Sequence, residues 1–147
     1  MSEEIKNYFI ISLIACIIGA PLVFLSEFAW YYNYGYYVES WGSIYFSLEY
    51  PIPAILIGLV TLGLFFGAYI SYLGMQGLVT ESQLKSAVMS VSLSLGIVVV
   101  GGLVFLIVML SEDLSDWGFS TGFYGGLISS VVALFFLNKA KTTIKKG

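Results

Sequence analysis

The chain has 147 residues, of which 59% are hydrophobic and only 10% are charged, and its mean hydropathy is +0.92. Soluble domains carry about 25% charged residues, so this composition excludes an ordinary water-soluble protein. All six basic residues are lysines, and the nine acidic residues outnumber them, which gives a net charge of −3. An acidic chain is a poor partner for nucleic acid, whose phosphates attract basic surfaces.

Four stretches between charged residues are each long enough to cross a bilayer as a helix. A helix needs about 20 apolar residues to span a hydrocarbon core of roughly 30 Å. The four stretches therefore predict spans near 8–26, 51–74, 87–110 and 119–138. None of them shows the period-two alternation of strands in a membrane barrel. The sequence thus predicts an all-α membrane protein, a single domain over 1–147 with four transmembrane helices in one bundle.

The distribution of lysine predicts the orientation of this bundle. Lysines occur only in the first tail, the middle loop and the last tail, whereas the loops 27–50 and 111–118 hold acidic residues and no lysine. Segments rich in lysine and arginine stay on the cytoplasmic side of a membrane. We therefore expect a multi-pass protein of the cell membrane with both termini in the cytoplasm and the two acidic loops outside.

The two halves of the chain share a short pattern at the outer ends of the first and third spans. Leu-Ser-Glu stands there twice, ending at Glu27 and at Glu112, and a Trp-Gly pair follows in each outer loop, at Trp41 and at Trp117. Two similar hairpins in tandem would form a parallel repeat about an axis along the membrane normal. Because these residues are common at membrane boundaries, duplication and coincidence both stay open.

Small residues recur four positions apart within the last three spans. They are Gly63, Gly67, Ser71, Ser90, Ser94, Gly122, Gly126 and Ser130. Lipid gives helices little hydrophobic drive to associate, and small side chains let their backbones approach closely enough for dispersion to hold them. The pattern predicts helix-packing positions within the bundle, with contacts to another chain as the alternative.

The first outer loop is unusually rich in aromatic residues. Tyrosine and tryptophan beside a span can anchor it at the headgroup level, but the middle of this loop holds more rings than two boundaries need. Aromatic residues are also enriched at protein interfaces. We expect the loop to bind a partner through Trp30, Tyr31, Tyr32, Tyr34, Tyr36, Tyr37 and Trp41. The alternatives are an aromatic belt or a lid over the protein's own helices, and a cage for a small ligand. A hairpin and an interfacial helix are both compatible with the loop.

The residues that usually carry chemistry inside membranes are missing. The chain has no histidine and no arginine, and no carboxylate lies within a predicted span, which removes the common proton relays. A serine nucleophile would need lysine as its base, and the lysines stand at the inner boundary. The single cysteine, Cys16, is expected to be a small packing residue. We therefore expect no catalytic residue, no cofactor, no resident metal and no enzymatic activity.

The acidic outer loops contain one further group of residues that could form a binding site. Glu27, Glu112, Asp113 and Asp116 all follow the outer ends of the first and third spans. Carboxylate oxygens are the ligands that Ca²⁺ prefers. A cation-binding rim is therefore one interpretation of these four residues, and a solvated acidic surface is the other.

Together, these observations predict a non-catalytic accessory or structural subunit that docks in a larger membrane assembly through its helix faces and aromatic outer loop. Its expected partners are the lipid bilayer and either other membrane protein subunits or further copies of itself. The alternative is an oligomeric channel or small transporter for ions or small solutes. In that case Ser90 and Ser94 would line the path and the acidic loops would attract cations.

Overall fold

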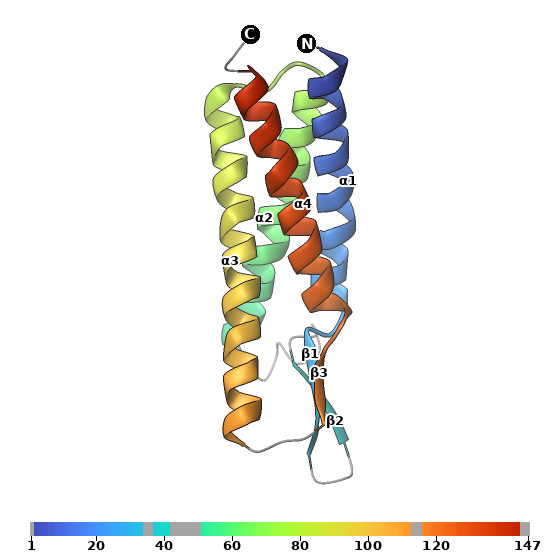
Figure 1. The fold of residues 1–147 in the computed structure, drawn as a ribbon, viewed down its shortest axis with the longest axis vertical. Coiled ribbons are helices and arrows are strands. Elements are labelled where there is room, and N and C mark those ends of the chain that lie inside the picture. The colour runs from blue at the N-terminus through green and yellow to red at the C-terminus, as the bar shows by residue number, and fades with distance from the viewer. Residues whose placement is uncertain (1, 34–36, 42–50, 113–115, 145–147) are drawn as a thin grey trace.

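A computed structural model of the chain describes residues 2–33, 37–41, 51–112 and 116–144. It contains four long helices, and α1 begins at the same end of the molecule at which α4 ends (Figure 1). The helices are α1 (Glu3–Leu25), α2 (Pro51–Met75), α3 (Glu81–Ser111) and α4 (Thr121–Ile144). All four are long and apolar enough to cross a membrane, which confirms the four predicted helices.

Two helices begin several residues before the predicted spans, α1 at Glu3 and α3 at Glu81. The side chain of Ser2 caps α1, and Thr80 and Gln83 cap α3 reciprocally in a capping box. Such caps satisfy the free backbone N–H groups of the first turn whether or not the turn lies in lipid. The apolar run shows which part of the helix can lie in lipid. The capping residues show where the helix begins, which is why α1 and α3 begin before the predicted spans.

The turn between α2 and α3 has a specific backbone geometry. Gly77 adopts a φ of +74°, a left-handed conformation that glycine reaches without strain. The N–H of Leu78 donates to the carbonyl of Leu73, and the N–H of Gly77 donates to that of Gly74. This pair of hydrogen bonds is a Schellman motif, which ends α2 and lets α3 return along the bundle.

The helices form a four-helix bundle in which each helix packs against two neighbours. α1 packs against α2 and α4, and α3 packs against the same two helices. In Figure 1, α4 lies in front, α2 behind, and α1 and α3 stand on opposite sides. Consecutive helices are therefore neighbours, and α1 and α4 are neighbours too.

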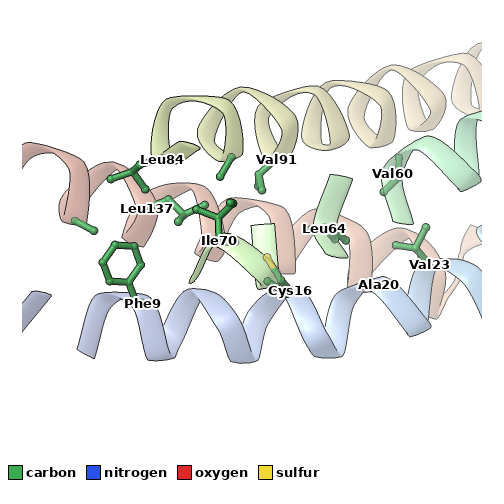
Figure 2. Close-up of a cluster of buried hydrophobic side chains, with 14 of the residues drawn as sticks. Phe9, Cys16, Ala20, Val23, Val60, Leu64, Ile70, Leu84, Val91 and Leu137 are labelled. Atoms are coloured by element: carbon green, nitrogen blue, oxygen red, sulfur yellow. The ribbon is translucent and has the colours of Figure 1, made fainter. Parts of the chain in front are cut away.

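The core is a column of apolar side chains between the four helices. Figure 2 shows side chains from all four helices meeting in this shared space, including Phe9, Cys16, Leu64, Ile70, Val91 and Leu137. Outward positions such as Ile14, Leu62 and Leu103 are equally apolar but exposed. A helix that is apolar all round is typical of a membrane span, so close packing rather than hydrophobicity separates the inside of this bundle from its outside.

A small antiparallel sheet stands at the end of the bundle away from α1's first residue (Figure 1). Its strands are β1 (Ala29–Asn33), β2 (Tyr37–Trp41) and β3 (Trp117–Phe119), in the order β2-β1-β3. The hairpin of β1 and β2 is one of the two conformations that the sequence left open for the first outer loop. The third strand was not predicted, and it moves the start of the fourth helix from 119 to Thr121.

Backbone hydrogen bonds extend the pairing of β1 with β3 at both ends. The N–H of Tyr32 donates to the carbonyl of Asp116 at 2.9 Å, and the N–H of Ser120 donates to the carbonyl of Phe28 at 3.0 Å. The two outer segments, far apart in the sequence, are therefore joined into one sheet that lies beside the end of α3.

Candidate functional site

One face of the sheet packs onto the end of α3. Alternate residues of a strand point to opposite faces, and Tyr31, Trp117 and Phe119 belong to the cluster formed with Phe105 and Met109 of α3. The ring of Phe105 lies 5.9 Å from that of Trp117 and 5.5 Å from that of Phe119, measured between centroids. This inner face holds the sheet against the bundle.

An aromatic column continues from the sheet into the helices. Phe119 stacks on Phe123 of α4 with 4.0 Å between ring centroids, and Phe28 meets Phe123 edge to face at 5.3 Å. A Cβ atom placed on Gly102 of α3 would lie 2.6 Å from the Phe123 ring, so glycine makes room for the column there. Offset and edge-to-face ring contacts stabilise such clusters beyond the area that they bury.

The other face of the sheet carries Trp30 and Tyr32, and we call this pair the outward aromatic face. Their rings meet edge to face at 5.9 Å. The indole of Trp30 covers Gly118, where a Cβ atom would lie 3.1 Å from the ring. Tyr32 keeps 46% of its surface exposed although the strand that carries it is paired on both sides. The backbone of the outward aromatic face is therefore held by strand pairing on both sides, and Tyr32 is its exposed side chain while Trp30 is half-buried.

The structure divides the predicted partner-binding set. Tyr31 points to the inner face and contributes to packing, whereas Trp30 and Tyr32 point outward. In β2, the backbone of Tyr37 pairs with Asn33 and that of Trp41 pairs with Ala29. Two further members of the set, Tyr34 and Tyr36, lie outside the described residues.

A second candidate surface is a groove of about 550 Å³ between α2 and α3, in the half of the bundle nearer the sheet. The described residues that line it are all apolar, and they include Phe28, Ile52, Leu56, Leu93, Ile97 and Gly101. We call this feature the α2–α3 groove. Its lining residues Leu56, Leu93 and Val100 are exposed on the sides of two predicted spans, so in a membrane the groove would face the lipid hydrocarbon rather than water.

Differences in glycine packing explain why the groove opens. A Cβ atom on Gly63 would lie 2.2 Å from the Ser94 hydroxyl, so α2 and α3 are in close contact at that depth. A Cβ atom on Gly96, which lines the groove, would meet no atom within 4 Å. The two helices therefore diverge toward the sheet. The sequence did not point to Gly96 because this residue falls outside the four-residue spacing of the predicted packing positions.

Most of the predicted helix-packing residues lie inside the chain's own bundle. Gly67 lies near Val91 and Cys16, and Gly126 lies near Val23 and Val98. The hydroxyl of Ser94 donates to the carbonyls of Val60 and Ser90, each at 3.2 Å. These contacts place the small residues at helix crossings within one chain.

Two polar features complete the bundle interior. The hydroxyl of Ser71 donates to that of Ser12 at 3.0 Å and to the carbonyl of Gly67 at 2.8 Å, linking α2 to α1. The hydroxyls of Thr61 and Ser130 are buried and have no hydrogen-bond partner among the described residues. An unpaired buried hydroxyl costs about 1–3 kcal/mol, so these two positions weaken the bundle.

The predicted acidic rim is dispersed over different elements. Glu27 follows α1, Glu112 caps the end of α3, and Asp116 precedes β3, while Asp113 lies outside the described residues. Within the described part of the chain, no three acidic, cysteine or histidine side chains come together in a way that would hold a metal ion.

Comparison of the chain with protein-family models, with curated proteins and with solved structures finds no significant match. The fold and the two candidate surfaces are therefore interpreted from their own geometry.

Proposed function

We propose that this protein is a non-catalytic subunit of a larger assembly in the cell membrane, held there by its outward aromatic face and by its α2–α3 groove. The observation that carries the proposal is the division of the sheet into two faces. The inner face is already packed against Phe105 and Met109 of α3. The outward face, with Trp30 and Tyr32, is left for contact with another molecule.

The outward aromatic face has the properties of a binding surface. Tyrosine and tryptophan bury a large area at little cost in side-chain entropy, and their truncation at an interface can cost about 2 kcal/mol or more. The backbone beneath Tyr32 is fixed by pairing on both sides. A surface that is ordered before binding loses less entropy when a partner docks.

The α2–α3 groove supports the same proposal within the membrane. Gly96, which lines the groove, borders open space that the chain's own packing does not use. Small residues on a lipid-facing helix let a second backbone approach closely. A transmembrane helix of a partner subunit would fill this space.

The orientation follows from charge and is part of the proposal. Lys6, Lys85 and Lys139 belong to the ends of α1, α3 and α4 that lie away from the sheet, whereas Glu112 and Asp116 lie at the sheet end. By the positive-inside rule, the termini are cytoplasmic and the sheet is outside the cell.

A tandem origin of the two halves is a further hypothesis. The residue that caps α1 is Ser26, whereas the residue that caps α3 is Glu112, so the two Leu-Ser-Glu matches differ by one position in their structural role. The first half also supplies two strands and the second half one. Superposition of α1 and α2 on α3 and α4 by rotation about the bundle axis would support duplication.

An oligomeric channel lined by Ser90 and Ser94 has less support. Ser94 is 1% exposed and its hydroxyl donates to carbonyls of α2 and α3. A path along this residue would require α2 and α3 to separate where Ser94 packs against Gly63 and Val60.

Purification in mild detergent tests the proposal. A Tyr32→Ser chain should lose a co-purifying polypeptide while its melting temperature stays unchanged. Tyr124→Ser is the matched control, because Tyr124 on α4 has a similar exposed fraction of 50% but lies off the sheet. If Tyr32→Ser retains every partner that the native chain retains, or if the chain purifies only as a conducting self-oligomer, the proposal is wrong.

A further inference from the structure

A second groove lies on the opposite half of the bundle from the α2–α3 groove, between α3 and α4. It has a volume of about 460 Å³, and we call it the α3–α4 groove. Leu95 of α3 and Val131, Leu134 and Phe135 of α4 form its apolar part. Asn138, Lys139 and Thr142 close it at the end where α4 terminates. The groove is therefore apolar along its length and cationic at one end.

The cationic end is organised by local contacts. The ammonium nitrogen of Lys139 lies 5.6 Å from the centroid of the Phe135 ring, a cation–π distance that keeps the charge over the groove. Within the described part of the chain, no carboxylate forms an ion pair with this ammonium group. Its charge is thus available to an anionic ligand.

The neighbouring polar groups determine which donors are free. The amide nitrogen of Asn138 donates one hydrogen bond to the carbonyl of Leu134 at 3.0 Å, and an amide group has a second N–H to offer. The hydroxyl of Thr142 is directed at the carbonyls of Asn138 and Lys139, both at 3.0 Å. Lys139 and Asn138 are therefore the donors that remain for a ligand.

The length of the groove matches one leaflet of a bilayer. From Val131 to Thr142 a helix rises about 16 Å at 1.5 Å per residue, and half of the hydrocarbon core is about 15 Å. Lys85, Val88, Ser92 and Leu95 follow the spacing 3, 4, 3 along α3, which places Lys85 on the groove side at the same end as Lys139. An elongated molecule with an apolar tail and an anionic head fits both the length of the groove and the lysines at its end.

We propose that the α3–α4 groove binds an anionic phospholipid of the leaflet on the side of the termini, with one acyl chain along Leu95, Val131 and Leu134 and the phosphate at Lys139 and Asn138. Basic pockets between transmembrane helices at the membrane boundary are suited to such headgroups. The carbonyl groups at the end of α4 disfavour an anion, so the lysine is required. The proposal depends only on the chain spanning a membrane and is independent of any protein partner.

Native mass spectrometry of the purified full-length chain tests the site. Phosphatidylglycerol and phosphatidylcholine with the same palmitoyl and oleoyl chains are titrated separately, and the bound fraction is measured for each. The native chain should bind phosphatidylglycerol about five-fold more tightly, the equivalent of roughly 1 kcal/mol for one lysine near the membrane surface. Lys139→Gln should abolish this preference.

Lys141→Gln is the matched control, because Lys141 stands two residues further along α4 and does not line the groove. This variant should keep the preference for phosphatidylglycerol. Val131→Trp should weaken binding of both lipids by filling the apolar part while every lysine remains. If Lys139→Gln and Lys141→Gln lose the preference for phosphatidylglycerol equally, the lipid is attracted by the basic end as a whole and not by a site at Lys139. If the native chain binds the two lipids equally, it has no site for the headgroup. Either result overturns the proposal.

Discussion

The backbone N–H of Gly122 donates to the carbonyl of Glu27 at 2.8 Å, and this hydrogen bond ties the first turn of α4 to the segment that leaves α1. A Cβ atom on Gly122 would lie 2.7 Å from that carbonyl oxygen and 3.0 Å from the carbonyl oxygen of Ser26. Both neighbours are backbone atoms, which cannot rotate away. The junction between α1, β1 and α4 therefore requires glycine at this position.

Gly122→Ala should lower the stability of the bundle by about 1–3 kcal/mol, the usual cost of forcing extra atoms into a packed site. The measurement is thermal unfolding in detergent. Gly96→Ala is the control, because a Cβ atom there meets nothing within 4 Å. Equal melting temperatures for Gly122→Ala and the native chain would contradict the close approach described for this junction.

The pairing of β1 with β3 predicts a specific disulfide. Trp30 and Gly118 are direct partners in the register, and paired antiparallel residues lie at a Cα separation that a disulfide can bridge. Trp30→Cys with Gly118→Cys should cross-link on oxidation. Trp30→Cys with Phe119→Cys should not, because Phe119 points to the opposite face. If only the second pair cross-links, the true register of β1 and β3 differs by one residue from the pairing of Trp30 with Gly118. The native Cys16 is buried and does not compete.

The inner and outward faces of the sheet should respond differently to truncation. Phe105 is fully buried between Trp117 and Phe119, so Phe105→Ala should cost about 3–5 kcal/mol of stability. Tyr32→Ala should change stability by less than about 1 kcal/mol, because the side chain is half exposed. Chemical unfolding in detergent would measure both. A larger loss for Tyr32→Ala would mean that the outward aromatic face belongs to the core.

The hydrogen bond between Ser71 and Ser12 should make a small contribution to stability. Interhelical hydrogen bonds in membranes average about 0.6 kcal/mol in double-mutant cycles, and Ser71 also donates to the carbonyl of Gly67. The cycle of Ser12→Ala, Ser71→Ala and the double variant should give a coupling energy of this size. A coupling energy of zero would mean that the two hydroxyls do not interact in the folded bundle.

The proposed orientation can be tested in intact cells with a membrane-impermeant thiol reagent. Glu112→Cys, at the sheet end of α3, should be labelled, because this position is exposed and predicted to lie outside. Gln76→Cys, in the turn between α2 and α3, should be labelled only after the membrane is opened. The reverse pattern would place the sheet in the cytoplasm and overturn the orientation.

The sequence by itself determined the four helices and their approximate limits. Whether a segment dissolves in lipid depends on its own side chains, so uncharged runs such as those around Leu64 and Val98 are recognisable without knowledge of their neighbours. The aromatic outer loop and the small-residue faces were visible for the same reason. The separation of lysines from the acidic loops is likewise a property of the linear chain.

Only the tertiary structure decided which of these residues pack inside the bundle and which remain exposed for contact with another molecule. Gly63 and Gly96 are the same residue type in similar surroundings along the chain, yet one is packed against Ser94 and the other borders an open groove. Trp30 and Tyr31 are neighbours in one strand, yet one faces outward and the other packs on α3. These outcomes depend on contacts between segments far apart in the sequence, such as β1 with β3. In a bundle that is apolar inside and outside, no local pattern of hydrophobicity distinguishes a buried face from one that meets lipid.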